Sequence, residues 1–190
     1  MPTAADILDA AEAIHQREGL AALSLRRVAD AVGVTPMALY RHYADKDALL
    51  DALVARGFSI LEGYFAAAAA KRSPRARIGA GVTQYREFAL DHPRLFELMY
   101  FVRRRGVPTA PDSLRVTPSP SFARLIESVN ECMERGEIRR GDAGETILLV
   151  WATAHGLIAL HFTGRFGGDD ERFRALFDKV VTEQIRLLAP

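Results

Sequence analysis

The sequence has little of what marks secreted, membrane-spanning or disulfide-bonded proteins. Its 190 residues include a single cysteine, Cys132, which cannot form an intrachain disulfide. Residues 1–19 carry acidic side chains where a signal peptide would carry a basic segment and an apolar run. The longest apolar stretch, residues 147–162, is short for a bilayer span and contains two histidines. We therefore interpret 147–162 as a buried core helix and expect a cytoplasmic protein with no membrane partner.

The sequence also lacks a strong charge of either sign. Its formal net charge is +1, and within residues 1–56 the acidic residues outnumber the basic ones. Overall charge therefore indicates no particular partner. The distribution is more informative, because residues 24–46 contain four basic and two acidic residues, and His42 can add a further positive charge. Any positively charged binding surface is expected to be local.

Signatures of catalysis and of metal binding are missing as well. The HExxH, GxSxG and P-loop patterns do not occur, and residues 79–84 (GAGVTQ) lack the third glycine and the preceding strand of a dinucleotide loop. Cys132 and the five histidines do not have the spacing of metal ligands. The sequence therefore predicts no enzyme, no metal and no cofactor.

Signals for strands are almost absent, whereas helical signals recur along the whole chain. Thr3 can cap a first helix that Gly19 ends. Ser24 is a natural N-cap for a second helix over 25–32, and Gly33 follows as a turn residue. The fold is therefore predicted to be all-α.

The later helices follow the same logic. Thr35 can cap a short helix that has Pro36 at its first position and ends near His42 and Tyr43. A longer helix follows from Asp45 to about residue 70. Further helices are predicted over about 75–91, 93–104, 119–136, 142–164 and 170–188, with a proline-rich connection over 103–120. The total is about nine helices.

The first three helices have the spacing of a helix-turn-helix, in which the second short helix enters the major groove of DNA. Leu39 can anchor that helix to a small core. The residues that remain can contact DNA: Pro36, Met37, Ala38 and Arg41 could face bases, Tyr40 and His42 could bind phosphates, and Thr35 and Lys46 lie at helix N-termini, which favour anions. The alternative interpretation of the first three helices is a helical bundle that binds no DNA. Tyr43 is better explained as a core residue than as a DNA contact.

At these residues the sequence resembles the N-terminal domain of TetR-family (tetracycline-repressor-like) transcriptional regulators. The family pattern is matched by Gly33, Thr35, Leu39-Tyr40, His42-Tyr43, Lys46 and Leu49-Leu50. The resemblance implies an N-terminal three-helix domain over 1–50, with the helix-turn-helix at about 24–43. It also implies a C-terminal helical ligand-binding and dimerisation domain over 51–190.

The resemblance implies roles for individual residues and for the whole protein. Phosphates would be bound by Thr35, Tyr40, His42 and Lys46, a base or phosphate by Arg26, and bases would be faced by Pro36, Met37, Ala38 and Arg41. The protein would be a repressor that binds a palindromic double-stranded DNA operator as a homodimer and is released by a small apolar or aromatic effector. A competing interpretation is a small-molecule-binding protein that has lost DNA binding. Such a protein would be expected to lose Tyr40, His42 or Lys46 first, and all three are present.

The C-terminal half resembles a TetR subgroup marked by a tryptophan and a His-Gly pair (WATAHG, 151–156) together with a segment like HPRLFELMY (92–100). Trp151 and His155 are four residues apart, so they share one helix face. We interpret them as core residues first and as ligand contacts second. The candidate residues for a ligand cavity are Tyr85, Phe88, Phe96, Met99, Met133, Trp151 and His155, each of which could equally be ordinary core.

The last two predicted helices each offer a second apolar face. On one helix it comprises Ala152, Ala159, Leu160 and Thr163, and on the other Phe173, Leu176, Phe177, Val180 and Ile185. Gly156 and Ala159 would permit close approach of a neighbouring helix. A monomer would expose these faces, so we expect a homodimer formed through both helices.

Overall fold

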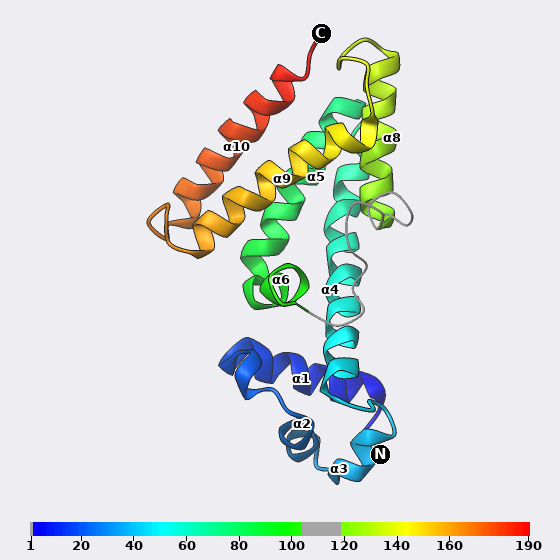
Figure 1. The fold of residues 1–190 in the computed structure, drawn as a ribbon, viewed down its shortest axis with the longest axis vertical. Coiled ribbons are helices and arrows are strands. Elements are labelled where there is room, and N and C mark those ends of the chain that lie inside the picture. The colour runs from blue at the N-terminus through cyan, green and yellow to red at the C-terminus, as the bar shows by residue number, and fades with distance from the viewer. Residues whose placement is uncertain (1, 104–118) are drawn as a thin grey trace. The chain divides into compact units, whose positions relative to one another are not determined.

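The computed structural model describes residues 2–103 and 119–190. Within these residues the chain forms nine α-helices and a short 3₁₀ helix, η1 (Leu20–Ala22), and no strand (Figure 1). The all-α prediction is therefore confirmed. The predicted proline-rich connection over 103–120 lies almost entirely outside the described residues.

The described residues divide into two compact units. The first contains the chain up to Ile60 together with His92–Arg103, and the second contains Leu61–Asp91 and the chain from Ser119 onward. The boundary between the units therefore falls inside a helix, α4 (Lys46–Ala69). The sequence predicted a domain boundary at residue 50, whereas the first unit extends to Ile60 and also includes residues 92–103.

The first unit begins with α1 (Ala4–Glu18), which is capped as the sequence predicts. The Asp6 amide donates to the Thr3 hydroxyl at 3.2 Å, and the Thr3 amide donates to the Asp6 carboxylate at 2.6 Å. Gly19 ends the helix with a φ of 83°. α1 buries Ile7, Ala11 and Ile14, so it can pack on the next helix through the predicted apolar face.

The next two helices form the helix-turn-helix. α2 (Leu25–Val32) is capped by Ser24, and Gly33 leaves it in the left-handed conformation, with a φ of 72° that glycine adopts without strain. α3 (Pro36–Tyr40) is shorter than predicted. It ends at Tyr40 because the amides of His42 and Tyr43 both donate to the Leu39 carbonyl and close the chain into a turn.

A helix from the middle of the chain completes the first unit. α6 (Pro93–Tyr100) packs against α1, and Nε2 of the buried His15 lies 3.0 Å from the carbonyl oxygen of Arg94. The helix was predicted to continue to 104 but ends at Tyr100. The amides of Phe101 and Val102 both donate to the Glu97 carbonyl, a pattern that closes a helix end.

The second unit is built around α5 (Pro74–Asp91). This helix packs against α8 (Pro120–Glu134), α9 (Ala143–Phe162) and α10 (Asp170–Leu187). Its Arg86 is buried, and the guanidinium bonds Asp178 at 2.6 Å and Glu87 at 2.5 Å and lies over the Phe177 ring. A buried charge needs such partners, so these contacts fix α10 on α5.

The last two helices run antiparallel and side by side (Figure 1). By length and composition α9 could cross a membrane, as could α4 among the described helices. Ile147, Val150, Ala154 and Ile158 of α9 are buried, so core packing explains part of its apolar composition. The prediction of a core helix over 147–162 therefore holds for one face only, because Leu149 and Leu160 of the same helix are exposed.

One prediction about these two helices is wrong. Phe173, Phe177 and Ile185 of α10 were assigned to a face for a second copy of the chain, but they are buried within the second unit. Phe177 is 0% exposed and lies edge-on to Phe173, and Phe173 stacks on the His161 ring at 4.1 Å. These three residues serve the core of the monomer.

Candidate DNA-binding interface and effector cluster

The helix-turn-helix is held by a small apolar core. Leu25, Val28 and Ala29 of α2 are buried, and Leu39 is the one residue of α3 with 0% exposure. The amide of Val34 donates to the carbonyl of Ala29 and fixes the turn between the helices. α3 is thus anchored through a single side chain, and the rest of its surface is available.

The predicted base-facing and phosphate-binding residues share that surface. Met37 is 73% exposed and Tyr40 50% exposed. Thr35, Pro36, Arg41 and His42 are exposed, and Ala38 is half-buried. The Thr35 hydroxyl accepts the Ala38 amide at 3.3 Å, so it caps α3 in addition to any role toward a phosphate. All seven residues lie within residues 35–42, so they lie together on α3 and at its two ends.

Two neighbouring arginines at the start of α2 differ in their contacts. Arg27 donates to the Glu18 carboxylate at 2.7 Å and to the Ala22 carbonyl at 3.2 Å. Arg26 is exposed and makes no hydrogen bond or ion pair with the part of the chain that the structure describes. Of these two arginines, Arg26, the predicted contact, is therefore the one whose charge no described residue neutralises.

Tyr43 and Lys46 follow α3 on its C-terminal side. Lys46 is half-buried, and its ammonium donates to the carbonyl of Leu20 at 3.2 Å. Tyr43 is also half-buried, and burial raises the pKa of its phenol. The partial burial of Tyr43 agrees with its interpretation as a core residue. The Lys46 tether could not have been found from sequence spacing, because Leu20 is 26 residues away.

In the second unit, three of the predicted effector residues come together. The Tyr85 hydroxyl lies 2.9 Å from Nδ1 of His155, and the rings of Trp151 and His155 lie 5.3 Å apart. Phe122, which the sequence analysis missed, joins them edge-on to Trp151 at 6.4 Å. Burial lowers the pKa of His155, so the imidazole is neutral near pH 7. The cluster is aromatic, contains a hydrogen-bonding pair and carries no charge.

The other four predicted effector residues lie elsewhere. Phe88 is buried in the second unit and packs edge-on against Tyr64, and Met133 lines a separate open hollow of about 450 Å³ beside Arg139 and Arg140. Phe96 and Met99 belong to α6 in the first unit, where Met99 packs against Gly57. Sequence periodicity could not separate these positions from Tyr85, Trp151 and His155, since all seven are apolar or aromatic.

Two family models match the chain. The model described as "Bacterial regulatory proteins, tetR family" matches residues 7–53, and the model described as "Tetracyclin repressor-like, C-terminal domain" matches residues 78–184, which is more than half of the chain. Among curated proteins no match was found.

Solved structures share the fold over the full length. A protein with unknown function from Rhodococcus sp. RHA1 is 30% identical, and the match covers 100% of this chain and 97% of that chain with a TM-score of 0.83. The TetR family transcriptional regulator PfmR from Thermus thermophilus is 16% identical (95% and 97% covered, TM-score 0.66). The fatty acid degradation regulator FadR from Bacillus halodurans is 15% identical (96% and 98% covered, TM-score 0.72). Because the two family models match segments in both units, and one of them covers more than half of the chain, this chain belongs to the TetR family of transcriptional regulators.

Proposed function

We propose that the protein is a cytoplasmic repressor that binds a palindromic DNA operator as a homodimer and is released by a small apolar or aromatic effector. The observation that carries DNA binding is the surface of α3. One buried side chain, Leu39, anchors the helix, and Pro36, Met37 and Tyr40 of the same helix are exposed. A short helix that presents its side chains in this way suits insertion into a major groove.

These exposed side chains, together with the half-buried Lys46, divide by chemistry into two roles. Tyr40, His42 and Lys46 can donate hydrogen bonds to phosphate oxygens, and they would fix the register on any sequence. Arg41 can donate two hydrogen bonds to a guanine edge, whereas Met37 can contact only apolar groups such as the methyl of thymine. Sequence preference would therefore depend on Arg41, on thymine methyls and on DNA shape.

The homodimer is supported by the exposed side of α9. Leu149 is 61% exposed and Leu160 45% exposed, and Ala152 and Gly156 lie between them at helical spacing. A second copy of the chain would cover this apolar face, and the small residues would let the two helices approach closely. Two-fold symmetry would then present two α3 helices to two half-sites, which explains why the operator would be a palindrome.

We propose that the effector binds at Tyr85, Trp151 and His155, with Phe122. An uncharged aromatic cluster favours an apolar or aromatic ligand, and the hydroxyl–imidazole pair can orient one polar group of it. This assignment follows the Trp and His-Gly subgroup that the sequence resembles. To release DNA, the ligand must bind more tightly to a state of the dimer in which the spacing of the two α3 helices does not fit the operator. A coupling of about 1–3 kcal/mol would change operator affinity roughly 5- to 150-fold.

The direct test is to select bound fragments from a random DNA pool with the full-length protein and to read their sequences. The expected result is a palindrome with half-sites about one helical turn apart or slightly more. Operator affinity is then measured with and without compounds from a broad screen, in the wild type and in Trp151→Ala. Selection of no common sequence would refute the operator. A compound that binds the second unit and leaves operator affinity unchanged would refute the coupling.

A further inference from the structure

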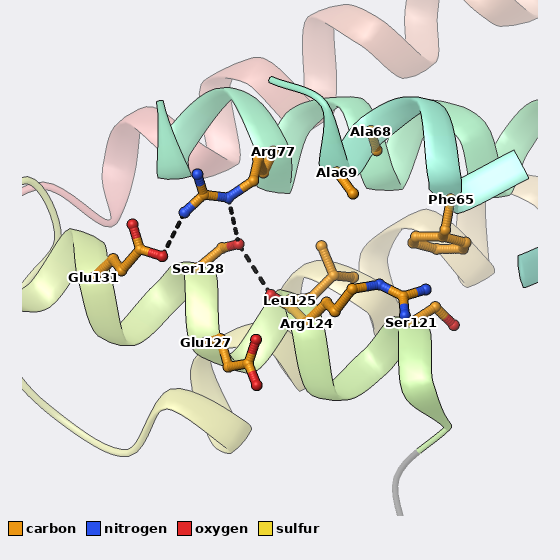
Figure 2. A pocket seen from close by; sticks show the side chains of 10 residues that line it. All are labelled: Phe65, Ala68, Ala69, Arg77, Ser121, Arg124, Leu125, Glu127, Ser128 and Glu131. Atoms are coloured by element: carbon orange, nitrogen blue, oxygen red, sulfur yellow. Dashed lines mark hydrogen bonds and ion pairs between the residues drawn. The ribbon is translucent and has the colours of Figure 1, made fainter. Parts of the chain in front are cut away.

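A cavity of about 220 Å³ opens between the end of α4, the start of α5 and the face of α8 that runs from Ser121 to Glu131 (Figure 2). It is lined by ten residues of the second unit, and none of them is a predicted effector residue. At about 30 Å³ per water molecule, the volume equals about seven waters. It therefore suits a molecule with one or two rings.

The floor of the cavity is apolar and fixed. Phe65, Ala68 and Leu125 are buried residues of its lining. Phe65 and Leu125 also close over Gly81, where an added Cβ would lie 2.8 Å from Leu125 and 3.1 Å from the Phe65 ring. Because these side chains already touch the α5 backbone, they cannot sink further to fill the space. The floor offers apolar surface to a ligand without rearrangement.

The first arginine of the lining is neutralised by its neighbours. Arg77 reaches from α5 to α8, where its Nε donates to the Ser128 hydroxyl at 3.1 Å and its guanidinium pairs with Glu131 at 2.5 Å (Figure 2). A third guanidinium nitrogen is within 3.5 Å of the carbonyls of residues 71 and 72. All three nitrogens are therefore engaged, and an anionic ligand would have to break these bonds.

The second arginine is neutralised as well. Arg124 pairs with Glu62 of α4 at 2.5 Å, and the amide of Ser121 donates to the other Glu62 oxygen at 2.8 Å. Burial alone would raise the pKa of Glu62, but the hydrogen bonds from Ser121 and Arg124 outweigh it and leave the pKa lowered. Glu62 is thus charged at neutral pH, and neither arginine favours an anion.

Among the described residues, one carboxylate of the lining remains uncompensated. Glu127 lies on α8 between Arg124 and Glu131 and is exposed. Its carboxylate makes no ion pair or hydrogen bond within residues 2–103 and 119–190. We infer that this cavity binds a small amphipathic organic cation, an amine whose ammonium group pairs with Glu127 and whose apolar body lies on Phe65 and Leu125. This site is separate from the proposed effector cluster, and it does not depend on DNA binding.

The test compares two probes of the same ring and opposite charge, tryptamine and indole-3-propionate, by calorimetric titration of the full-length protein near pH 7. Tryptamine is expected to bind with a stoichiometry of one per chain and at least about tenfold more tightly than the anion. Glu127→Gln should weaken tryptamine binding roughly threefold to fivefold, the range of an exposed ion pair. Glu134→Gln is the matched control, because Glu134 is exposed on the same helix and does not line the cavity, and it should change nothing.

A second pair of variants tests the location. Ala69 lines the cavity and its exposed neighbour Ala70 does not, so Ala69→Leu should fill the space and abolish tryptamine binding while Ala70→Leu leaves it intact. Equal affinity for the two probes, or unchanged tryptamine binding in Glu127→Gln or Ala69→Leu, would overturn the proposal. Because DNA is absent from these titrations, their outcome is independent of the proposed repressor function.

Discussion

The ammonium nitrogen of Lys46 lies 3.2 Å from the carbonyl oxygen of Leu20, so the first turn of α4 is tied to η1, the segment that leads into α2. An ammonium group has three donors, and one bond to Leu20 leaves two for a phosphate oxygen. The tether fixes the long Lys46 side chain before DNA arrives. A phosphate contact would then lose less side-chain entropy than one made by a freely rotating lysine.

We predict that Lys46→Met weakens operator binding on all sequences and reduces the slope of log affinity against log salt by about one. The reason is the loss of one positive charge that displaces a counterion from DNA. Fluorescence anisotropy at several salt concentrations measures both quantities. A variant with lower affinity and an unchanged slope would mean that Lys46 acts through Leu20 alone and does not touch DNA.

The two arginines of α2 give a matched pair. Arg26→Ala should weaken DNA binding and leave thermal stability unchanged, because Arg26 has no partner among the described residues. Arg27→Ala removes an exposed ion pair to Glu18 that contributes about 0–1 kcal/mol, so it should lower the melting temperature slightly and change DNA affinity less. Band-shift titration and thermal melting of both variants test this contrast. The reverse ranking on DNA would assign the contact to Arg27.

Two changes, Tyr40→Phe at the end of α3 and Arg41→Ala at its C-cap, should separate phosphate contacts from base contacts. Arg41→Ala should cost about 1–3 kcal/mol on the preferred operator and relax preference at particular base pairs. Tyr40→Phe should weaken binding similarly on every sequence, because it removes one hydrogen-bond donor to a phosphate. Competition with operators altered one base pair at a time measures the difference. The docking is wrong if Tyr40→Phe alters base preference and Arg41→Ala does not.

The dimer proposal is tested on α9 and not on the core of α10. Leu160→Asp places a charge on an exposed apolar face and should yield a folded monomer. Phe177→Asp places a charge in the core of the monomer, so it should unfold the protein or make it insoluble. Light scattering after size-exclusion chromatography gives the mass, and circular dichroism reports folding. A dimer of unchanged stability in Leu160→Asp would exclude this face as the interface.

The half-buried His155 predicts a pH dependence of stability. Its ordinary pKa is 6.5, and burial lowers the pKa in the folded state, so below about pH 6.5 the unfolded chain binds a proton that the folded chain does not. The free energy of unfolding should therefore fall as the pH drops below that value. Melting temperatures of the wild type and His155→Gln between pH 8 and pH 5 test this. The difference in melting temperature between the two proteins should be constant above about pH 7. Below that pH the melting temperature of the wild type should fall more steeply than that of His155→Gln. An equal fall in both proteins would contradict the lowered pKa of His155.

Local sequence signals predicted most of the first unit because its helix ends depend on neighbouring residues. Thr3, Ser24 and Thr35 cap the helices that follow them, and Gly33 turns the chain at a positive φ. Such caps involve residues three positions apart, so they can be read directly from the sequence. The spaced polar residues of α3 likewise belong to one short segment, which is why the sequence alone is enough to group them.

The sequence by itself determined the helical class, the helix-turn-helix and the exposed residues of α3. Only the tertiary structure decided which aromatic residues meet, since Tyr85 and His155 are 70 residues apart and Phe96, though nearer to Tyr85 in the sequence, belongs to the other unit. It also decided that Phe177 belongs to the monomer core, because Arg86 of α5 lies over its ring. The physical reason is that periodicity gives the face of a helix on which a residue lies, while the helix that packs on that face depends on contacts between distant parts of the chain.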